Sequence, residues 1–136
     1  MTTGVITTSG GGGYEVLLED GCSVHAVLRG RVKRQSRVGA QVVIGDRVEV
    51  EEVESGTGRD WVVVNILPRT STITRRGHSE HRPKLIAANV DRMFAVVAAR
   101  DPEPRLAQLD RLLVIAEANE VAATVVINKV DLPETK

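Results

Sequence analysis

The sequence predicts a chain of the β plus α/β class, with a small β-barrel in its first half and a strand–helix–strand unit in its second. Short β-branched runs recur up to residue 68, with glycine-rich or acidic turns between them, and this spacing is typical of a barrel or sandwich. Beyond residue 88, two longer apolar runs flank a segment of helical periodicity. That alternation is typical of a βαβ unit with a parallel sheet.

The first half contains about five predicted strands, separated by turns rich in glycine, aspartate and serine. The fourth strand alternates valine with glutamate, and the alternation slips near Glu52, which favours a β-bulge there. Strands of this number and length suit an OB-fold, a partly open Greek-key barrel that often binds nucleic acid, with an SH3-like barrel as the near alternative. The predicted strands are residues 4–8, 14–18, 22–28, 47–54 and 61–67, and Pro68 ends the last.

The second half begins with an apolar run at residues 90–99, which predicts a buried strand. Asp101 is a candidate helix cap, because the prolines at 102 and 104 suit a first helical turn. A second apolar run at residues 121–127 predicts the second strand, and Asp110 between the runs is predicted to face solvent. The apolar face of the intervening helix is predicted at Leu106, Leu109, Leu112, Leu113 and Ala116.

Residues 69–88 have few apolar side chains and no clear period, which predicts a linker or an extended loop. The chain is thus expected to divide into a barrel at residues 1–68, this linker, and an α/β part at residues 89–136. His78 and His81 have no third metal ligand beside them, so we predict exposed histidines and no metal site. The linker is also basic, a feature as typical of solubility as of RNA contact, at Arg75, Arg76, Arg82 and Lys84.

The overall charge is balanced, with 18 basic and 18 acidic residues, but it is unevenly distributed. A cluster of basic residues follows the third predicted strand without an intervening acid. Within a candidate OB barrel, the cluster favours RNA binding through phosphate contacts over a merely solvated surface. Aromatic residues are 2% of the chain, so base stacking is a poor candidate for the main binding mode. The predicted RNA-binding residues are Arg29, Arg31, Lys33, Arg34 and Arg37.

The composition also bears on location and redox chemistry. No run of about 18 apolar residues is present, and the N-terminus lacks the basic start and apolar core of a signal peptide. We therefore expect a cytoplasmic protein without a membrane span. The single cysteine, Cys22, has no disulfide partner within the chain and excludes a zinc site built on cysteine pairs. We predict that its side chain is a small buried apolar group.

The second predicted strand of the α/β part runs directly into Asn128, Lys129, Val130 and Asp131, the pattern N-K-x-D. Ligands of open α/β sheets bind at the carboxyl ends of the strands, which is where this tetrapeptide lies. Guanine presents two adjacent N–H donors that one carboxylate accepts together, whereas adenine would leave the carboxylate unsatisfied. Asp131 is thus a candidate guanine reader, with Asn128 and Lys129 serving the base or holding a neighbouring loop.

A GTPase also needs a glycine-rich loop, G-x-x-x-x-G-K-[ST], to hold the phosphates. The residues before Asn128 contain no Gly-Lys dipeptide and no D-x-x-G motif. Two interpretations follow. Either the N-K-x-D pattern is an ordinary turn after a strand, or the phosphate loops follow it in a circularly permuted order.

Further motifs, taken in order, resemble one family, the GTPases that depend on the small ribosomal subunit and have a circularly permuted GTPase domain. The resemblance covers nearly the whole chain, and the order and spacing of the motifs carry it. The matching motifs are G-V-I at 4–6, V-x-R-G-R-x-x-R at 27–34, V-x-x-G-D-R-V at 42–48, residues 66–69, A-A-N-V-D at 87–91, L-D-R-L-L at 109–113 and I-N-K-V-D-L at 127–132.

The resemblance implies an N-terminal OB-fold that contacts ribosomal RNA, followed by a permuted GTPase domain and then a zinc-binding domain. It implies that Asn128, Lys129 and Asp131 bind the guanine of GTP or GDP, with Mg²⁺ at phosphate loops further along. The expected partners are the small ribosomal subunit and its 16S rRNA. The expected role is late maturation of that subunit, with GTP hydrolysis stimulated by the subunit.

The sequence departs from the family pattern because it stops at Lys136, before any P-loop, switch loop or zinc cysteine. We therefore expect a truncated piece that contains no catalytic residue and does not hydrolyse GTP alone. A lone βαβ unit also exposes strand edges, so self-association of the chain is a further expectation. The alternative function is a non-catalytic OB-fold module that binds RNA.

Overall fold

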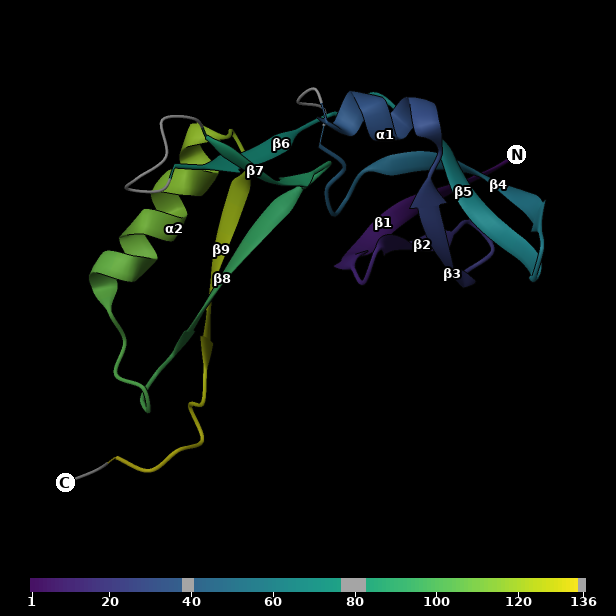
Figure 1. Cartoon of the computed structure of the whole chain (residues 1–136). Helices are drawn as coiled ribbons and strands as arrows, with labels where there is room; N and C mark the ends of the chain where they lie inside the picture. The colour runs from purple at the N-terminus through teal and green to yellow at the C-terminus, as the bar shows by residue number, and fades with distance from the viewer. Residues whose placement is uncertain (38–40, 77–82, 135–136) are drawn as a thin grey trace. The chain divides into compact units, whose positions relative to one another are not determined.

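A computed structural model describes residues 1–37, 41–76 and 83–134 of the chain (Figure 1). The chain folds into two compact units, residues 1–89 and residues 90–136. The first unit contains a closed β-barrel and a short two-stranded sheet, and the second contains a parallel strand pair with one helix. The predicted combination of a five-stranded barrel with a strand–helix–strand unit is confirmed.

The barrel closes in the strand order β1-β2-β3-β5-β4. Its strands are β1 (Thr2–Gly10), β2 (Gly13–Leu18), β3 (Ser23–Leu28), β4 (Arg47–Ser55) and β5 (Gly58–Ile66). Strands β3 and β5 pair in parallel, and β4 pairs antiparallel with both β1 and β5. This order is that of the OB-fold, so the topology decides between the two barrels that the strand pattern left open.

Alternate side chains of the barrel strands point inward and form an aliphatic core. Each core residue is less than a tenth exposed, and those that lie on the strands follow the period of two that places alternate side chains inward. Tyr14 and Trp61 are partly buried and pack against this core. The core consists of Ile6, Val16, Leu18, Ala26, Val32, Val42, Val48, Val50 and Val63.

Helix α1 (Gly30–Arg37) connects β3 to β4 and contributes Val32, which is 2% exposed, to the barrel core. Figure 1 shows the helix beside one end of the barrel strands. The sequence pattern did not predict this helix. The segment has one apolar residue, so no helical period is visible in the sequence, and the helix is specified by the arginine, lysine and glutamine residues and by the packing of Val32.

The bulge predicted near Glu52 is also misplaced. The pairing of β4 with β5 is continuous from Val50 to Ser55, and its irregularity lies one step earlier, where Val50 pairs with Val63 while Glu49 pairs with Asn65. The extra residue therefore belongs to β5, at Val64. The slip in alternation along β4 does not reveal it, because a bulge is a property of the strand pair.

The segment predicted as a linker contains two strands, β6 (Thr72–Arg75) and β7 (Lys84–Ala88), which pair antiparallel. A bridge between Ile44 and Ala87 joins this pair to the connection that precedes β4. The expectation of an extended loop is wrong for these two strands. Strands of four and five residues with mixed side chains show little periodicity, so tertiary pairing decides their conformation.

The second unit consists of β8 (Arg92–Ala98), α2 (Leu106–Ala118) and β9 (Ala122–Asn128). The two strands pair in parallel, and α2 contacts both of them. Asp110 on α2 is exposed, as predicted. The helix begins after Arg105, which makes no side-chain cap, so the prediction of Asp101 as the cap is wrong. Pro104 disfavours helical backbone at the residue before it, which delays the helix start.

Burial alternates between the two faces of β8 but not of β9, where Val125, the register partner of Ala95, is 40% exposed. Ala95 on β8 and Ala116 on α2 are both buried. Phe94 and Val96, which alternate with Ala95 and therefore point to the other face, are 60% and 59% exposed. Val126, the partner of Val96 in the register, is 37% exposed. Across the described ranges, no helix is long and apolar enough to cross a membrane.

Candidate functional sites

The N-K-x-D tetrapeptide forms the turn in which β9 ends. Asn128 is the last residue of β9, and Val130 and Asp131 lie in the turn that follows. Because β9 runs parallel to β8, this is the carboxyl edge of the sheet, the edge at which ligands bind in α/β folds. The tetrapeptide therefore occupies the position expected of a ligand-binding turn.

Local hydrogen bonds shape the turn itself. The Asn128 side-chain oxygen Oδ1 accepts a hydrogen bond of 2.8 Å from the backbone N–H of Lys129. Lys129 has φ of 59°, in the left-handed region. The backbone N–H of Leu132 donates to the Lys129 carbonyl over 3.3 Å and closes the turn. The asparagine of the motif thus stabilises a backbone bend that is uncommon for a residue with a side chain.

Contacts with the loop that follows β8 hold the turn in place. The Ala99 N–H donates to the Asn128 carbonyl over 2.9 Å and extends the strand ladder by one step. The Lys129 ammonium donates to the Asp101 carbonyl, and the Arg100 guanidinium donates to the Leu132 carbonyl. Of the roles expected for Lys129, the structure shows the tie to another loop. No local pattern in the sequence indicates Arg100, since its partner lies 32 positions away.

The side chains that would meet a base are open to solvent. Asn128, Lys129 and Asp131 are all exposed. A carboxylate at the tip of a fixed turn can accept two parallel N–H donors from one planar group, as the guanine edge offers. The backbone of the turn is thus fixed by the contacts described above, while the Asp131 side chain is accessible to a ligand.

The predicted RNA-binding cluster lies along α1 and just before it. Arg29, which precedes the helix, and Arg31 and Lys33, which lie on it, are exposed, whereas Val32 between them is buried. Burial of this valine orients the helix so that its basic side chains face solvent. Arg34 and Arg37 belong to α1, and their side chains are outside the described residues.

Strand β4 supplies acidic partners to this surface. Glu51 lies 3.2 Å from the Arg29 guanidinium, and both side chains are substantially exposed, at 41% and 61%. Glu52 makes a similar pair with Arg59 over 3.2 Å. Arg29 is therefore partly neutralised by Glu51, which the count of charges along the sequence did not indicate.

Other predicted features differ in outcome. Cys22 is exposed, so the prediction of a buried thiol is wrong; its N–H donates to the Asp20 carboxylate over 2.8 Å in an exposed turn. His78, His81 and Arg82 are outside the described residues. Within the described ranges, no three histidine, cysteine or acidic side chains gather in a group that would hold a metal ion. The remaining basic residues of the segment, Arg75, Arg76 and Lys84, are exposed.

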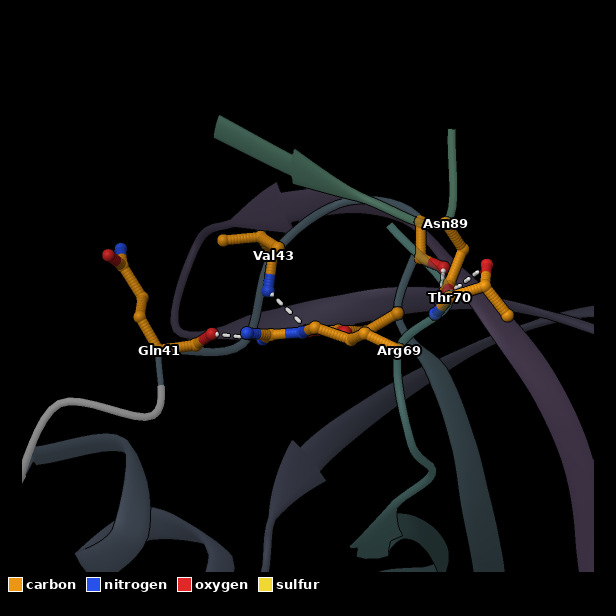
Figure 2. A network of polar contacts seen from close by, with 7 residues as sticks. Gln41, Val43, Arg69, Thr70 and Asn89 are labelled. Atoms are coloured by element: carbon orange, nitrogen blue, oxygen red, sulfur yellow. Dashed lines mark hydrogen bonds and ion pairs between the residues drawn. The ribbon is translucent and has the colours of Figure 1, made fainter. Parts of the chain in front are cut away.

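An ion pair that no sequence pattern indicated joins the residue before β4 to the segment after β5, and Figure 2 shows Arg69 in the network around it. The Asp46 side chain is fully buried. Arg69 donates two hydrogen bonds to the Asp46 carboxylate, from Nε to Oδ1 over 2.7 Å and from Nη2 to Oδ2 over 2.9 Å. The Val43 N–H also donates to Asp46 Oδ2, and Arg69 Nη2 donates to the Gln41 carbonyl. The hydrogen bond with Asp46 raises the pKa of Arg69, and desolvation opposes that rise.

Asn89 continues this network on the other side of Arg69 (Figure 2). Its side-chain oxygen accepts from the Thr70 N–H over 2.8 Å, and its amide nitrogen donates to the Gly45 carbonyl over 2.9 Å. Gly45 and Asp46 lie in the V-x-x-G-D-R-V motif, and Asn89 lies in A-A-N-V-D. A hydrogen bond between these two motifs therefore joins the connection before β4 to the residue that follows β7.

Comparisons with known proteins match this chain to one family. The family model described as RsgA GTPase matches residues 66–136. A small ribosomal subunit biogenesis GTPase RsgA from Gemmatimonas aurantiaca is 39% identical over 132 residues, which is 96% of this chain and 43% of the relative. The protein of the same name from Cytophaga hutchinsonii is 35% identical, over 95% of this chain and 42% of the relative.

A solved structure also matches, the crystal structure of YloQ, described as a circularly permuted GTPase. It superposes with a TM-score of 0.64 at 27% identity, over 99% of this chain and 43% of that chain. The chain thus spans about two-fifths of the length of the relatives that it matches. The match includes both the barrel and the strand–helix–strand unit.

Proposed function

This chain belongs to the RsgA GTPase family, and on that premise we propose that it supplies the RNA-binding barrel and the guanine-reading turn of a GTPase that assists late maturation of the small ribosomal subunit. The observation that carries the proposal is the position of the N-K-V-D turn. It lies at the carboxyl edge of a parallel strand pair and is held by three contacts from the loop after β8.

In this proposal Asp131 reads the base. Its carboxylate accepts the two N–H donors of guanine in a charge-assisted pair, which adenine cannot supply. Asn128 sets the bend of the turn through the Lys129 N–H, and Lys129 fixes the turn to the Asp101 carbonyl. The long apolar stem of Lys129 would then lie along the face of the base.

The barrel is the proposed contact with 16S rRNA. Arg29, Arg31 and Lys33 present positive charge from one short stretch, and Arg34 and Arg37 belong to the same helix. Exposed arginines and lysines bind phosphate without reading sequence, so the barrel would supply affinity and the RNA shape would supply selectivity. The small ribosomal subunit, and a cytoplasmic location with it, are the partner and place that this proposal implies.

GTP or GDP is the proposed nucleotide, and Mg²⁺ would accompany its phosphates. The 136 residues contain no G-x-x-x-x-G-K-[ST] motif, so the residues described here hold the base and not the phosphates. The zinc-binding domain that the resemblance implies would lie in the part of the relatives that this chain does not cover. We propose no catalytic residue within this chain.

The test is GTP turnover by the native protein that contains these residues, with and without purified small ribosomal subunits, comparing wild type with Asp131→Ala. We expect turnover to rise when subunits are added and to fall to background in the variant. Subunit binding should persist in Asp131→Ala, because the barrel is untouched. Binding of subunits without turnover by the wild-type protein would instead favour the non-catalytic RNA-binding module.

A further inference from the structure

We propose that Arg100 is a positioning residue for guanine recognition, and this inference rests on the proposed function of Asp131. Arg100 is half-buried in the loop that follows β8, and its guanidinium donates a hydrogen bond to the Leu132 carbonyl. Leu132 directly follows Asp131. The contact therefore fixes the backbone on the far side of the residue that would bind the base.

The three contacts between this loop and the turn hold residues on both sides of Asp131 in the sequence. Ala99 and Asp101 hold Asn128 and Lys129, which come before Asp131. Arg100 reaches past Asp131 and holds the residue that comes after it. The first half of the turn is thus fixed by the strand ladder and by Lys129, and the second half is fixed by Arg100.

The backbone hydrogen bond within the turn is weaker than the one that Arg100 donates. The Leu132 N–H donates to the Lys129 carbonyl at 3.3 Å, which is beyond the usual range for backbone hydrogen bonds. An arginine donor carries a full positive charge, which makes its bond to a carbonyl stronger than a neutral one. Without Arg100, Leu132 and with it the Asp131 backbone would be held by that longer bond, and the carboxylate would lose its fixed direction.

A bidentate contact depends on direction more than a single hydrogen bond does, so a loosened Asp131 should lose base discrimination before it loses all affinity. Inosine diphosphate provides the probe, because hypoxanthine keeps the N1–H donor of guanine and lacks the exocyclic amine. The ratio of the Kd for IDP to the Kd for GDP therefore reports whether Asp131 accepts both donors. The ratio compares two ligands on the same folded molecules, so it does not depend on the fraction of protein that is folded.

The experiment measures GDP and IDP binding by titration calorimetry to the native protein that contains these residues, for wild type, Arg100→Met, Arg100→Lys and Asp131→Ala. Arg92→Met is the matched control, because Arg92 also joins β8 to β9, through Thr124, but at the opposite end of the strands. We expect Arg100→Met to weaken GDP binding by about tenfold, the scale of one charged hydrogen bond, and to lower the IDP-to-GDP ratio. Arg100→Lys should restore part of the ratio, and Arg92→Met should leave it at the wild-type value.

The Asp131→Ala arm separates the two proposals. If Asp131→Ala keeps the wild-type ratio, the carboxylate does not read guanine and the proposed function of the turn fails. If Asp131→Ala brings the ratio close to one while Arg100→Met keeps it unchanged, the guanine proposal stands and the role of Arg100 is overturned. Equal loss in Arg100→Met and Arg92→Met would also overturn it, since that result indicates general loosening of the strand pair.

Discussion

Arg69 and Asp46 form a bidentate ion pair in which the Asp46 side chain is fully buried and the Arg69 side chain is 24% exposed. The two residues are 23 positions apart, one just before β4 and the other just after β5. Their contact fastens the entry and the exit of the last barrel hairpin to each other. A carboxylate buried to this degree needs such a partner, because an isolated buried charge is strongly destabilising.

Removing the arginine should therefore be costly. We expect Arg69→Met to lower the free energy of unfolding by about 3–5 kcal/mol, since it leaves the Asp46 charge buried without its partner. Chemical denaturation of the 136-residue chain, followed by tryptophan fluorescence from Trp61, measures this. Arg59→Met is the control, because the Arg59–Glu52 pair is exposed and should contribute less than about 1 kcal/mol. Equal effects of the two substitutions would contradict the interpretation.

The raised pKa of Arg69 determines how this contribution depends on pH. A cation whose pKa is higher in the folded state stabilises the fold fully below its unfolded-state pKa and loses that effect as the pH rises through the folded-state value. The Arg69 contribution should therefore stay constant from about pH 7 to about pH 10, far below the titration of any arginine. The measurement is the difference in the free energy of unfolding between wild type and Arg69→Met. A difference that shrinks with rising pH over this window would contradict the prediction.

Gly45 and Gly12 make a second matched pair. Both have positive φ, at 92° and 86°. A Cβ on Gly45 would lie 2.0 Å from the Ala88 carbonyl oxygen, whereas a Cβ on Gly12 would meet no described atom within 4 Å beyond its own chain neighbours. We expect Gly12→Ala to cost about 1–2 kcal/mol from backbone strain alone, and Gly45→Ala to cost about 3 kcal/mol or more. Thermal unfolding of both variants tests this, and a similar loss in both would show that the approach of β7 is not as close as described.

The basic cluster should control the salt dependence of RNA binding. Each phosphate contact that is removed should lower the slope of log K against log salt by about 0.7–0.9. Replacing Arg29, Arg31 and Lys33 by alanine together should therefore lower the slope by about 2–3. Fluorescence anisotropy with a 16S rRNA fragment over a potassium chloride series measures it. Arg59→Ala, an exposed arginine on β5, is the control and should leave the slope unchanged; a slope equally low in both would assign the contact elsewhere.

Glu51 should weaken RNA binding by competing for Arg29. The two side chains are 3.2 Å apart at the surface, so a phosphate must displace the carboxylate. We expect Glu51→Gln to tighten RNA binding by about two- to fivefold at low salt, the scale of an exposed ion pair. Glu52→Gln removes an equal charge from the same strand but from the Arg59 pair, and it should have a smaller effect. Identical gains from both variants would indicate a general charge effect and not release of Arg29.

Much of the fold and of the candidate site could be predicted from local pattern. The barrel strands and the βαβ unit follow from alternation and helical spacing, which depend on neighbours in the sequence. The N-K-x-D turn follows from its place directly after an apolar strand. Helix α1, with one buried valine, and the short pair β6–β7 were missed, because each is held by packing or pairing with residues elsewhere in the chain.

The sequence by itself determined the strand content of the barrel, the parallel strand pair and the position of Asp131 at its carboxyl edge. The tertiary structure alone decided the barrel topology, the burial of Asp46 under Arg69 and the contact of Arg100 with Leu132. The reason is separation along the sequence, because the two side-chain contacts join residues 23 and 32 positions apart. Periodicity reports which face of an element is apolar, and it contains no information on which distant polar group will meet a given charge.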